Sequence, residues 1–496
     1  MNNKRATKRA LLTSVMALVM CVVMLVGTTF AWFTDTASTG VNKIQAGNLD
    51  VELQMKDSGG NWVKAEGETL NWVKAEGHEN EQILWEPGCT YELPELRIVN
   101  KGNLALKYKI SISGAKDATP ENDKNDLKLL DVIDWTYNVS GDGGATVAEL
   151  GTERHLAAKT GEADVFDTLT IKGQMQTSAG NDYQGMAIEG IAITVVATQA
   201  TAEFDSFDDQ YDKGAEYPIL VTTGDELQAI VSNATAPVNI VLTNSITTNN
   251  FVIPKDKDVT LDLNGFTLTG GDSHAILNRG TLYIKDSSGN GKIVASKANT
   301  SALRNGDNAV CVIEGGTFTR TNAADNKWHT VENFGTMTFN GGKVIANDGQ
   351  SFAIVNGWNY INPGEQKATM TIKNIDMEAG PNGLKNCAGG ILTMNGGTLH
   401  CTNYWGLSND STGVATINGG KIISDQYVAI SDGGAKMEIN GGTFAGPQGS
   451  LYVQSYAKDT VVKGGSYQNE TKEFMQKYCA PGYTAKSENG VVVVSR

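Results

Sequence analysis

Cysteine and proline are scarce in this chain of 496 residues, which contains 6 Cys and 10 Pro against 56 Gly. Cys21 lies in an apolar run at the N-terminus, and an odd, scattered set remains after it: Cys89, Cys311, Cys387, Cys401 and Cys479. A small disulfide scaffold needs a dense and paired set of cysteines, so this class is excluded. Abundant glycine with little proline favours a turn-rich, all-β structure.

Histidine and basic residues are also few. The pair His78-Glu79 has Gln82 where a zinc-binding HExxH pattern needs its second histidine, so we expect no metal and no other cofactor. The 40 Lys and Arg residues face 55 Asp and Glu residues, and the formal net charge is −15. This balance favours solubility and argues against nucleic acid as a partner.

Long apolar runs are missing except near the N-terminus, where Leu11 to Val26 follows Lys4, Arg5, Lys8 and Arg9. The run is short for a membrane span and normal for a secretory signal, and Ala31 ends a small-residue cleavage site. We expect export with cleavage between Ala31 and Trp32, which gives a signal peptide over 1–31. An uncleaved anchor extending through Phe33 is the alternative.

One short phrase returns through the second half of the chain with small changes of spelling. It reads IEGGTF, FNGGKV, MNGGTL, INGGKI, INGGTF and VKGGSY, and its first glycines are Gly315, Gly341, Gly396, Gly419, Gly441 and Gly464. The steps are 26, 55, 23, 22 and 23 residues, and the longest step divides at a degenerate copy, Ile372 to Met377. A period of this size indicates a repeat architecture.

The phrase alternates apolar and other residues with the period of a strand. Residues two before and three after the first glycine are apolar in every copy, as Ile417 and Ile422 are around Gly419. We expect two inward columns, with a corner at each glycine pair where a Cβ would clash or φ must be positive. Two strands and two corners per period, stacked on the next, predict a right-handed parallel β-helix.

A second phrase ends in Asn or Asp once per period. The residues that end it are Asn278, Asn305, Asn333, Asn356, Asn386, Asn409 and Asp432. Asn and Asp tolerate the left-handed conformation and bond their own backbone. We therefore expect them to form the second structural corner.

Both ends of this solenoid carry elements that suit caps. Thr223 and Glu226 fit a capping box, and apolar residues follow at helical spacing, which predicts a helix over 224–232. The last segment, 479–496, is typical of a hairpin that covers the other end. We expect about nine coils over 217–478, after an acidic linker at 204–216.

The segment 32–203 lacks the repeats and has short alternating runs separated by polar turns. Two such runs flank a turn at Asn100 to Asn103, which predicts a hairpin, and several strands of this kind predict a β-sandwich.

The run LVGTTFAWFTDTASTGVNKIQAGNLDVEL, from Leu25 to Leu53, resembles the signal and mature start of the TasA/camelysin family, and LWEPG and VNKGNLALKYK resemble the same family. The resemblance implies a jelly-roll sandwich, processing by a SipW-type signal peptidase, and export to the surface or matrix of a monoderm bacterium. It also implies self-association into fibres, with Trp32, Phe33, Val41 and Ile44 in a donor strand. A disordered leader is the alternative for that segment. Camelysin-like members are described as metallopeptidases, which makes that activity a minor alternative.

The start of the repeats, with LDLNGFTL, resembles the pectate-lyase-like β-helices of bacterial surface proteins. That resemblance raises an enzyme, a polysaccharide lyase or glycoside hydrolase, as the main alternative function. Such enzymes need a cluster of carboxylates or a basic residue beside them. The acidic residues of the repeats are scattered among turn positions, so we assign no catalytic residue.

Aromatic residues recur near the Asn and Asp positions, and the candidates for binding a glycan are Trp328, Trp358, Tyr404, Trp405 and Tyr427. Rings projecting on one side stack on sugars, although a ladder that only stabilises the coils is equally compatible with the spacing. The sequence therefore predicts a secreted, non-enzymatic surface or matrix protein. Its β-helix would serve as a spacer and as a surface for host or bacterial polysaccharide.

Overall fold

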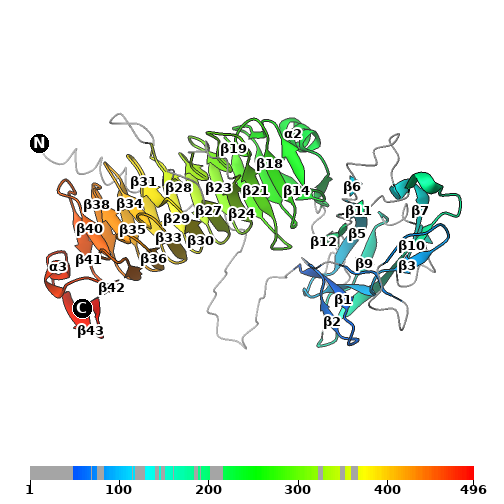
Figure 1. Cartoon of the computed structure of the whole chain (residues 1–496), viewed down its shortest axis with the longest axis horizontal. Coiled ribbons are helices and arrows are strands. Elements are labelled where there is room, and N and C mark those ends of the chain that lie inside the picture. The colour runs from blue at the N-terminus through cyan, green and yellow to red at the C-terminus, as the bar shows by residue number, and fades with distance from the viewer. Residues whose placement is uncertain are drawn as a thin grey trace, which may run out of the picture.

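The computed structural model describes residues 49–66, 68, 70–74, 83–113, 116–117, 129–139, 145–146, 151–159, 161–183, 188–189, 192–200, 216–321, 328–346, 352–358 and 367–496. In these residues the chain is all-β, with a strand-rich N-terminal part followed by a long solenoid, the rod in Figure 1. The expected signal peptide, the cleavage site Ala31 and Trp32, the donor strand and nearly all of the linker lie outside the described residues.

The rod is a parallel β-helix built of three sheets, so each coil contributes three strands. The expectation of two strands per coil was wrong, because the phrase that ends in Asn is itself a strand. The rod has about ten turns rather than nine.

Each of the three sheets stacks strands from successive coils. The first sheet contains, in stacking order, β13 (Ile219–Val221), β14 (Val238–Leu242), β17 (Asp258–Asp262), β20 (Thr281–Lys285), β23 (Val310–Ile313), β26 (Thr336–Phe339), β29 (Thr369–Ile372), β32 (Ile391–Met394), β35 (Val414–Ile417), β38 (Lys436–Ile439) and β41 (Thr460–Val462). The second contains β15 (Ile246–Thr248), β18 (Thr267–Gly270), β21 (Lys292–Ala295), β24 (Thr317–Arg320), β27 (Lys343–Ala346), β30 (Asp376–Ala379), β33 (Thr398–Cys401), β36 (Lys421–Ser424), β39 (Thr443–Ala445) and β42 (Gly465–Gln468). The third contains β16 (Val252–Ile253), β19 (Ile276–Asn278), β22 (Leu303–Asn305), β25 (Val331–Asn333), β28 (Phe352–Asn356), β31 (Asn382–Asn386), β34 (Leu407–Asn409), β37 (Ile430–Asp432) and β40 (Leu451–Val453).

The two inward columns are confirmed. Ile417 is paired with Ile439 in the first sheet and Ile422 with Phe444 in the second, and all four side chains are fully buried. The degenerate copy keeps the register, since Ile372 pairs with Met394. Alternating strand residues therefore fill the interior of the rod as the sequence predicts.

In every pair except the one at Gly315, the two glycines have different reasons to be glycine. A Cβ on the first, as at Gly419, would stand 2.8 Å from the carbonyl oxygen of Asn395 in the preceding coil. The second, as at Gly420, has a φ of +96°, which side chains rarely tolerate. Both of the reasons that the sequence left open thus apply, one to each position.

The Asn phrase forms a buried ladder of side-chain amides, which we call the asparagine ladder. Each Nδ2 donates to Oδ1 of the next member over 2.8 Å, and the last bond, from Asn409 to Asp432, is 2.9 Å. None of the seven residues has positive φ, so the expected left-handed conformation was wrong. They do bond local backbone, because Gly280 N donates to Asn278 Oδ1 over 3.1 Å.

Caps close both ends of the rod. Helix α2 (Gly224–Asn233) begins after Thr223, whose side chain accepts from Glu226 N over 3.2 Å, and buries Leu227 and Val231 over the first coils. At the far end β43 (Thr484–Glu488) and β44 (Val491–Ser495) form the expected hairpin, and β44 pairs antiparallel with β42. A short helix that the sequence did not predict, α3 (Lys472–Gln476), packs beside them.

The N-terminal domain has two main sheets around a buried core that contains Leu96, Tyr108 and Leu169, and a smaller separate core contains Ile133 and Met175. One sheet has the order β2-β1-β4-β10-β7-β8, with β3 beside β10, and the other has the order β12-β5-β9. The strands are β1 (Val51–Lys56), β2 (Trp62–Lys64), β3 (Thr90–Glu92), β4 (Leu96–Asn100), β5 (Leu106–Ser113), β7 (Ile133–Val139), β8 (Ala145–Thr146), β9 (Arg154–Leu156), β10 (Val165–Met175) and β12 (Ala192–Gln199). A further small sheet joins β6 (Lys116–Asp117) to β11 (Ile188–Glu189), and two short 3-10 helices are η1 (Leu129–Val132) and η3 (Asn181–Tyr183).

The hairpin expected at Asn100 to Asn103 is wrong, because β4 and β5 belong to different sheets. The buried Asn100 side chain holds the crossing: its Nδ2 donates to Leu104 O over 2.8 Å and to Ala157 O over 2.9 Å. An unsatisfied buried amide would be costly, so this residue fixes the change of sheet.

The N-terminal domain contacts the α2 end of the rod (Figure 1). Tyr217 Oη donates to Glu153 Oε2 over 3.0 Å, and Lys109 Nζ lies 4.7 Å from the centre of the Tyr217 ring. Asn264 of the rod also donates from Nδ2 to Thr194 Oγ1 over 3.4 Å.

Candidate functional site: aromatic turns on the rod

Four of the five predicted aromatic residues lie in turns between the second and third sheets. We call Trp328, Tyr404, Trp405 and Tyr427, with the neighbouring His329, the aromatic edge. The turn after β33 carries Tyr404 and Trp405, the turn after β36 carries Tyr427, and the segment before β25 carries Trp328.

The two tyrosines stack because two successive turns share one shape. Tyr404 N donates to Cys401 Sγ over 3.4 Å, and Tyr427 N donates to Ser424 Oγ over 2.9 Å. Cys401 and Ser424 are paired at the ends of β33 and β36, so each turn begins from an equivalent position. The ring centres are 4.9 Å apart with an angle of 7° between the planes, close to the strand spacing of about 4.8 Å.

Trp405 completes a small cluster with these rings. Its ring centre lies 4.1 Å from that of Tyr404 and 6.1 Å from that of Tyr427. Tyr404 is 37% exposed, so the cluster has a face open to solvent. The indole Nε1 of Trp405 is shielded and has no hydrogen-bond partner in the structure.

A second group lies nearer to α2 along the same edge. Trp328 and His329 have ring centres 5.5 Å apart, and the ring of Phe352 lies 6.2 Å from that of His329. Trp328 Nε1 and His329 Nδ1 are also shielded and unpartnered. Buried donors without partners are rare, and both indole N–H groups point into the aromatic edge rather than to its exposed face.

Trp358 is not part of this edge. It follows the third sheet and stacks on Phe334, with ring centres 3.9 Å apart and an interplanar angle of 22°. The guanidinium of Arg304 lies 4.8 Å from the centre of the Phe334 ring. Trp358 is near an Asn position like the other candidates, but this does not bring it to them, and its pair with Phe334 stabilises a different corner.

A buried carboxylate on the outer side of the third sheet was missed by the sequence reasoning. Glu332 is 2% exposed, Ser301 Oγ donates to its Oε2 over 2.7 Å, and Arg304 Nη1 lies 3.4 Å away. His274 Nδ1 is 4.0 Å from the same oxygen and accepts from Ser301 N over 2.9 Å. In the sequence, the only indication was a charged residue between Val331 and Asn333. The strand is three residues long, and the sequence predicts nothing about its middle residue.

Burial lowers the pKa of both histidines in this region. For His274 the carboxylate of Glu332 opposes the shift and Arg304 adds to it. For His329 Glu332 again opposes the shift, and Arg320 and Lys385 favour it. Because His274 Nδ1 accepts from a backbone N–H, the His274 ring is neutral, with its proton on Nε2.

The described residues contain no group of three or more His, Cys, Asp or Glu side chains placed to hold a metal ion. The cysteines found there, Cys89, Cys311, Cys387, Cys401 and Cys479, form no disulfide with one another. Burial raises the pKa of the Cys387 thiol to about 11, so that thiol stays protonated at neutral pH. No helix in the described ranges is both long enough and apolar enough to cross a membrane.

Comparison with models of known protein families gives no match, and comparison with curated proteins gives none. The assignment of function therefore rests on the residues and their geometry.

Proposed function

We propose that this chain is a secreted, non-enzymatic protein of a cell surface or extracellular matrix. Its rod serves as a spacer that presents a glycan-binding surface, and its N-terminal part is a TasA/camelysin-like jelly roll used for assembly or attachment. A SipW-type signal peptidase would release the mature chain, a step that N-terminal sequencing of exported protein tests. The host would be a monoderm bacterium.

The aromatic edge is the observation that carries the binding part of this proposal. The stacked pair of exposed Tyr404 and half-buried Tyr427 offers flat apolar faces, with the ring of Trp405 beside them. Sugar rings present apolar faces to aromatic side chains, so the arrangement suits a polysaccharide.

A glycan array followed by retention on the polysaccharide it identifies tests the binding. Trp405→Ala removes one ring of the cluster, so retention should fall while the melting temperature changes little. Tyr452→Ala is the matched control, because Tyr452 is 49% exposed on β40, away from the edge. Loss of melting temperature with unchanged retention would instead assign the rings to stabilising the coils.

Self-association would use the segment before Leu49 as a strand donated to another copy. The support is that β12 ends its sheet, with no further strand beside it among the described residues. A free edge gains backbone hydrogen bonds from an added strand, and head-to-tail addition does not close on itself.

The enzyme alternative, an extracellular lyase or hydrolase, is favoured by the surroundings of Glu332. A buried carboxylate beside Arg304 and His274 is a combination that acid–base chemistry uses. Assays for new reducing ends and for unsaturated products, with Glu332→Gln as the inactive control, test it. Product formation that Glu332→Gln abolishes would replace the non-enzymatic proposal.

A further inference from the structure

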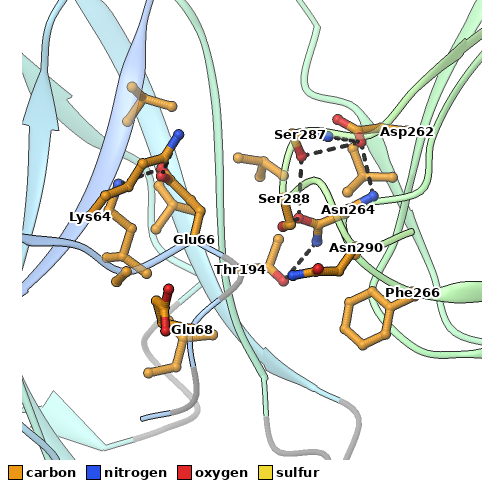
Figure 2. Close-up of a pocket in the computed structure, with 18 of the residues that line it drawn as sticks. Lys64, Glu66, Glu68, Thr194, Asp262, Asn264, Phe266, Ser287, Ser288 and Asn290 are labelled. Carbon is orange, nitrogen blue, oxygen red and sulfur yellow. Dashed lines mark hydrogen bonds and ion pairs between the residues drawn. The ribbon is translucent and has the colours of Figure 1, made fainter. Parts of the chain in front are cut away.

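A cavity of about 890 Å³ lies between the N-terminal domain and the first coils of the rod (Figure 2). One wall comes from β12 and from described residues between Asp50 and Trp72, and the other from the turns that follow β17 and β20. The volume falls in the range of ligand sites, which occur preferentially between domains. It lies apart from the aromatic edge.

The rod wall is preformed and presents hydroxyl and amide groups. Asp262 Oδ1 accepts from Asn264 N over 2.9 Å and from Ser287 N over 3.0 Å, and Lys285 Nζ lies 3.4 Å from Oδ2. These bonds fix both turns, and Asn264 has a φ of +47° in the first. Ser288 Oγ donates to Asn264 Oδ1 over 3.1 Å (Figure 2).

The opposite wall is acidic. Glu66 is held by Leu53 N at 3.0 Å and by Lys64 at 3.0 Å, so its charge is compensated. Asp50 and Glu68 also line the cavity and make no ion pair within the described residues. The lining contains four carboxylates and two lysines, so its formal charge is −2. Lys285 pairs with Asp262 and Lys64 with Glu66, which leaves the charges of Asp50 and Glu68 uncompensated within the lining.

Aromatic rings complete the lining. Phe266 of the rod and Trp72 of the N-terminal domain both line the cavity and are only half-buried. Trp72 is held in place by Trp85, 5.3 Å away edge-to-face, and by Trp135, stacked at 5.8 Å. The cavity thus combines aromatic rings with hydroxyl, amide and carboxylate groups, a combination typical of saccharide-binding sites.

We propose that this cavity binds a short oligosaccharide that is uncharged or carries amines. The excess of carboxylates disfavours uronic acids and other anionic sugars, because the exposed carboxylates of Asp50 and Glu68 repel a like charge at the rim of the cavity. A ligand in this position touches both domains, so its binding also restricts their relative motion.

Titration calorimetry of the full mature chain with tetrasaccharides of glucose, glucosamine and galacturonic acid tests this site. We expect binding of the glucosamine or glucose oligomer and none of the galacturonate oligomer. Glu68→Lys should weaken binding of the glucosamine oligomer by roughly tenfold or more. Glu488→Lys is the matched control, since Glu488 is an exposed glutamate in the terminal hairpin.

A second variant separates this site from the aromatic edge. Phe266→Ala should weaken binding of the same oligomer while Trp405→Ala leaves it unchanged. Binding that survives both Glu68→Lys and Phe266→Ala but is lost in Trp405→Ala would overturn the cavity site and support the proposed function. Preference for the galacturonate oligomer, or no binding of any of the three, would also overturn it.

Discussion

The side chain of Asn409 donates from Nδ2 to Oδ1 of Asp432 over 2.9 Å, and this bond ends the asparagine ladder. An amide can accept from one neighbour and donate to the next, whereas a carboxylate only accepts. Asp432 also accepts from Gly434 N over 3.1 Å and from Thr460 Oγ1 over 2.6 Å. The hydrogen bonds of the asparagine ladder therefore all point in the same direction along the rod. They end at Asp432, whose carboxylate has no N–H to donate.

Interrupting the asparagine ladder should destabilise the rod strongly. Asn386→Leu removes bonds to Asn356 and Asn409, both of 2.8 Å, so one buried N–H of Asn356 and the buried Oδ1 of Asn409 lose their partner. We expect a loss of about 2–4 kcal/mol in the free energy of unfolding, measured by urea denaturation. The control Asn440→Ala removes an exposed hydrogen bond of 2.8 Å from Asn440 Nδ2 to Asn418 Oδ1. It should lower the free energy of unfolding by less than about 1 kcal/mol. Equal costs would show that burial does not set the strength of these bonds.

Shortening an inward side chain should cost far more than shortening an outward one. Ile417 is fully buried against Ile439, so Ile417→Ala should lower the free energy of unfolding by about 2–5 kcal/mol. Lys421, four residues later on β36, is exposed, and Lys421→Ala should be nearly silent. Thermal and chemical denaturation of the two variants gives the comparison, and a silent Ile417→Ala would contradict the packing.

Stability should fall as the pH drops from about 7 to 5. Burial lowers the pKa of His274 and His329 in the folded state, while a histidine in an unfolded chain titrates near about 6.5. Below about pH 6.5 the histidines of the unfolded chain therefore bind protons more readily than those of the folded chain. The free energy of unfolding then falls as the pH drops below that value. The stabilisation from Asp164, whose pKa is lowered by Lys159 and Lys101, is lost only at a more acidic pH, below about 4.

The double variant His274→Gln with His329→Gln tests this assignment. Its free energy of unfolding should vary less over that range than the free energy of the parent chain. An unchanged slope would place the titrating groups elsewhere.

Assembly should depend on the segment before Leu49. A chain that begins at Trp32 should form filaments, and one that begins at Leu49 should stay monomeric, because the second lacks the donated strand. Light scattering and electron microscopy at matched concentration make the comparison. Monomers from both chains, over a range of pH and salt, would rule out assembly by strand donation.

The inward columns could be predicted from the sequence because a period of two, repeated every 22 to 26 residues, has few structural solutions. The third sheet could not, since three residues such as Leu407 to Asn409 are too short to show a period. The sequence at Asn100 predicted a hairpin, because a polar turn between two alternating runs can join two strands of one sheet or strands of two different sheets.

The candidate site was predictable only in part. The recurrence of aromatic residues near the Asn and Asp positions picked out Tyr404 and Tyr427, and they stack. It did not separate Trp358, which follows its strand of the third sheet, whereas the other four candidates precede theirs. Glu332 escaped notice because its partners, Ser301 and His274, come from preceding coils and no local pattern links them.

The asparagine ladder has a consequence for how such a rod can diversify. Successive members are separated by between 23 and 30 residues, yet the bond that joins them stays at 2.8–2.9 Å. The turn from β33 to β34 spans only 402–406, whereas the connection from β24 to β25 spans 321–330. Insertions and deletions in the turns thus leave the core in register, so natural variation can reshape the outer surface of a coil without disturbing its neighbours.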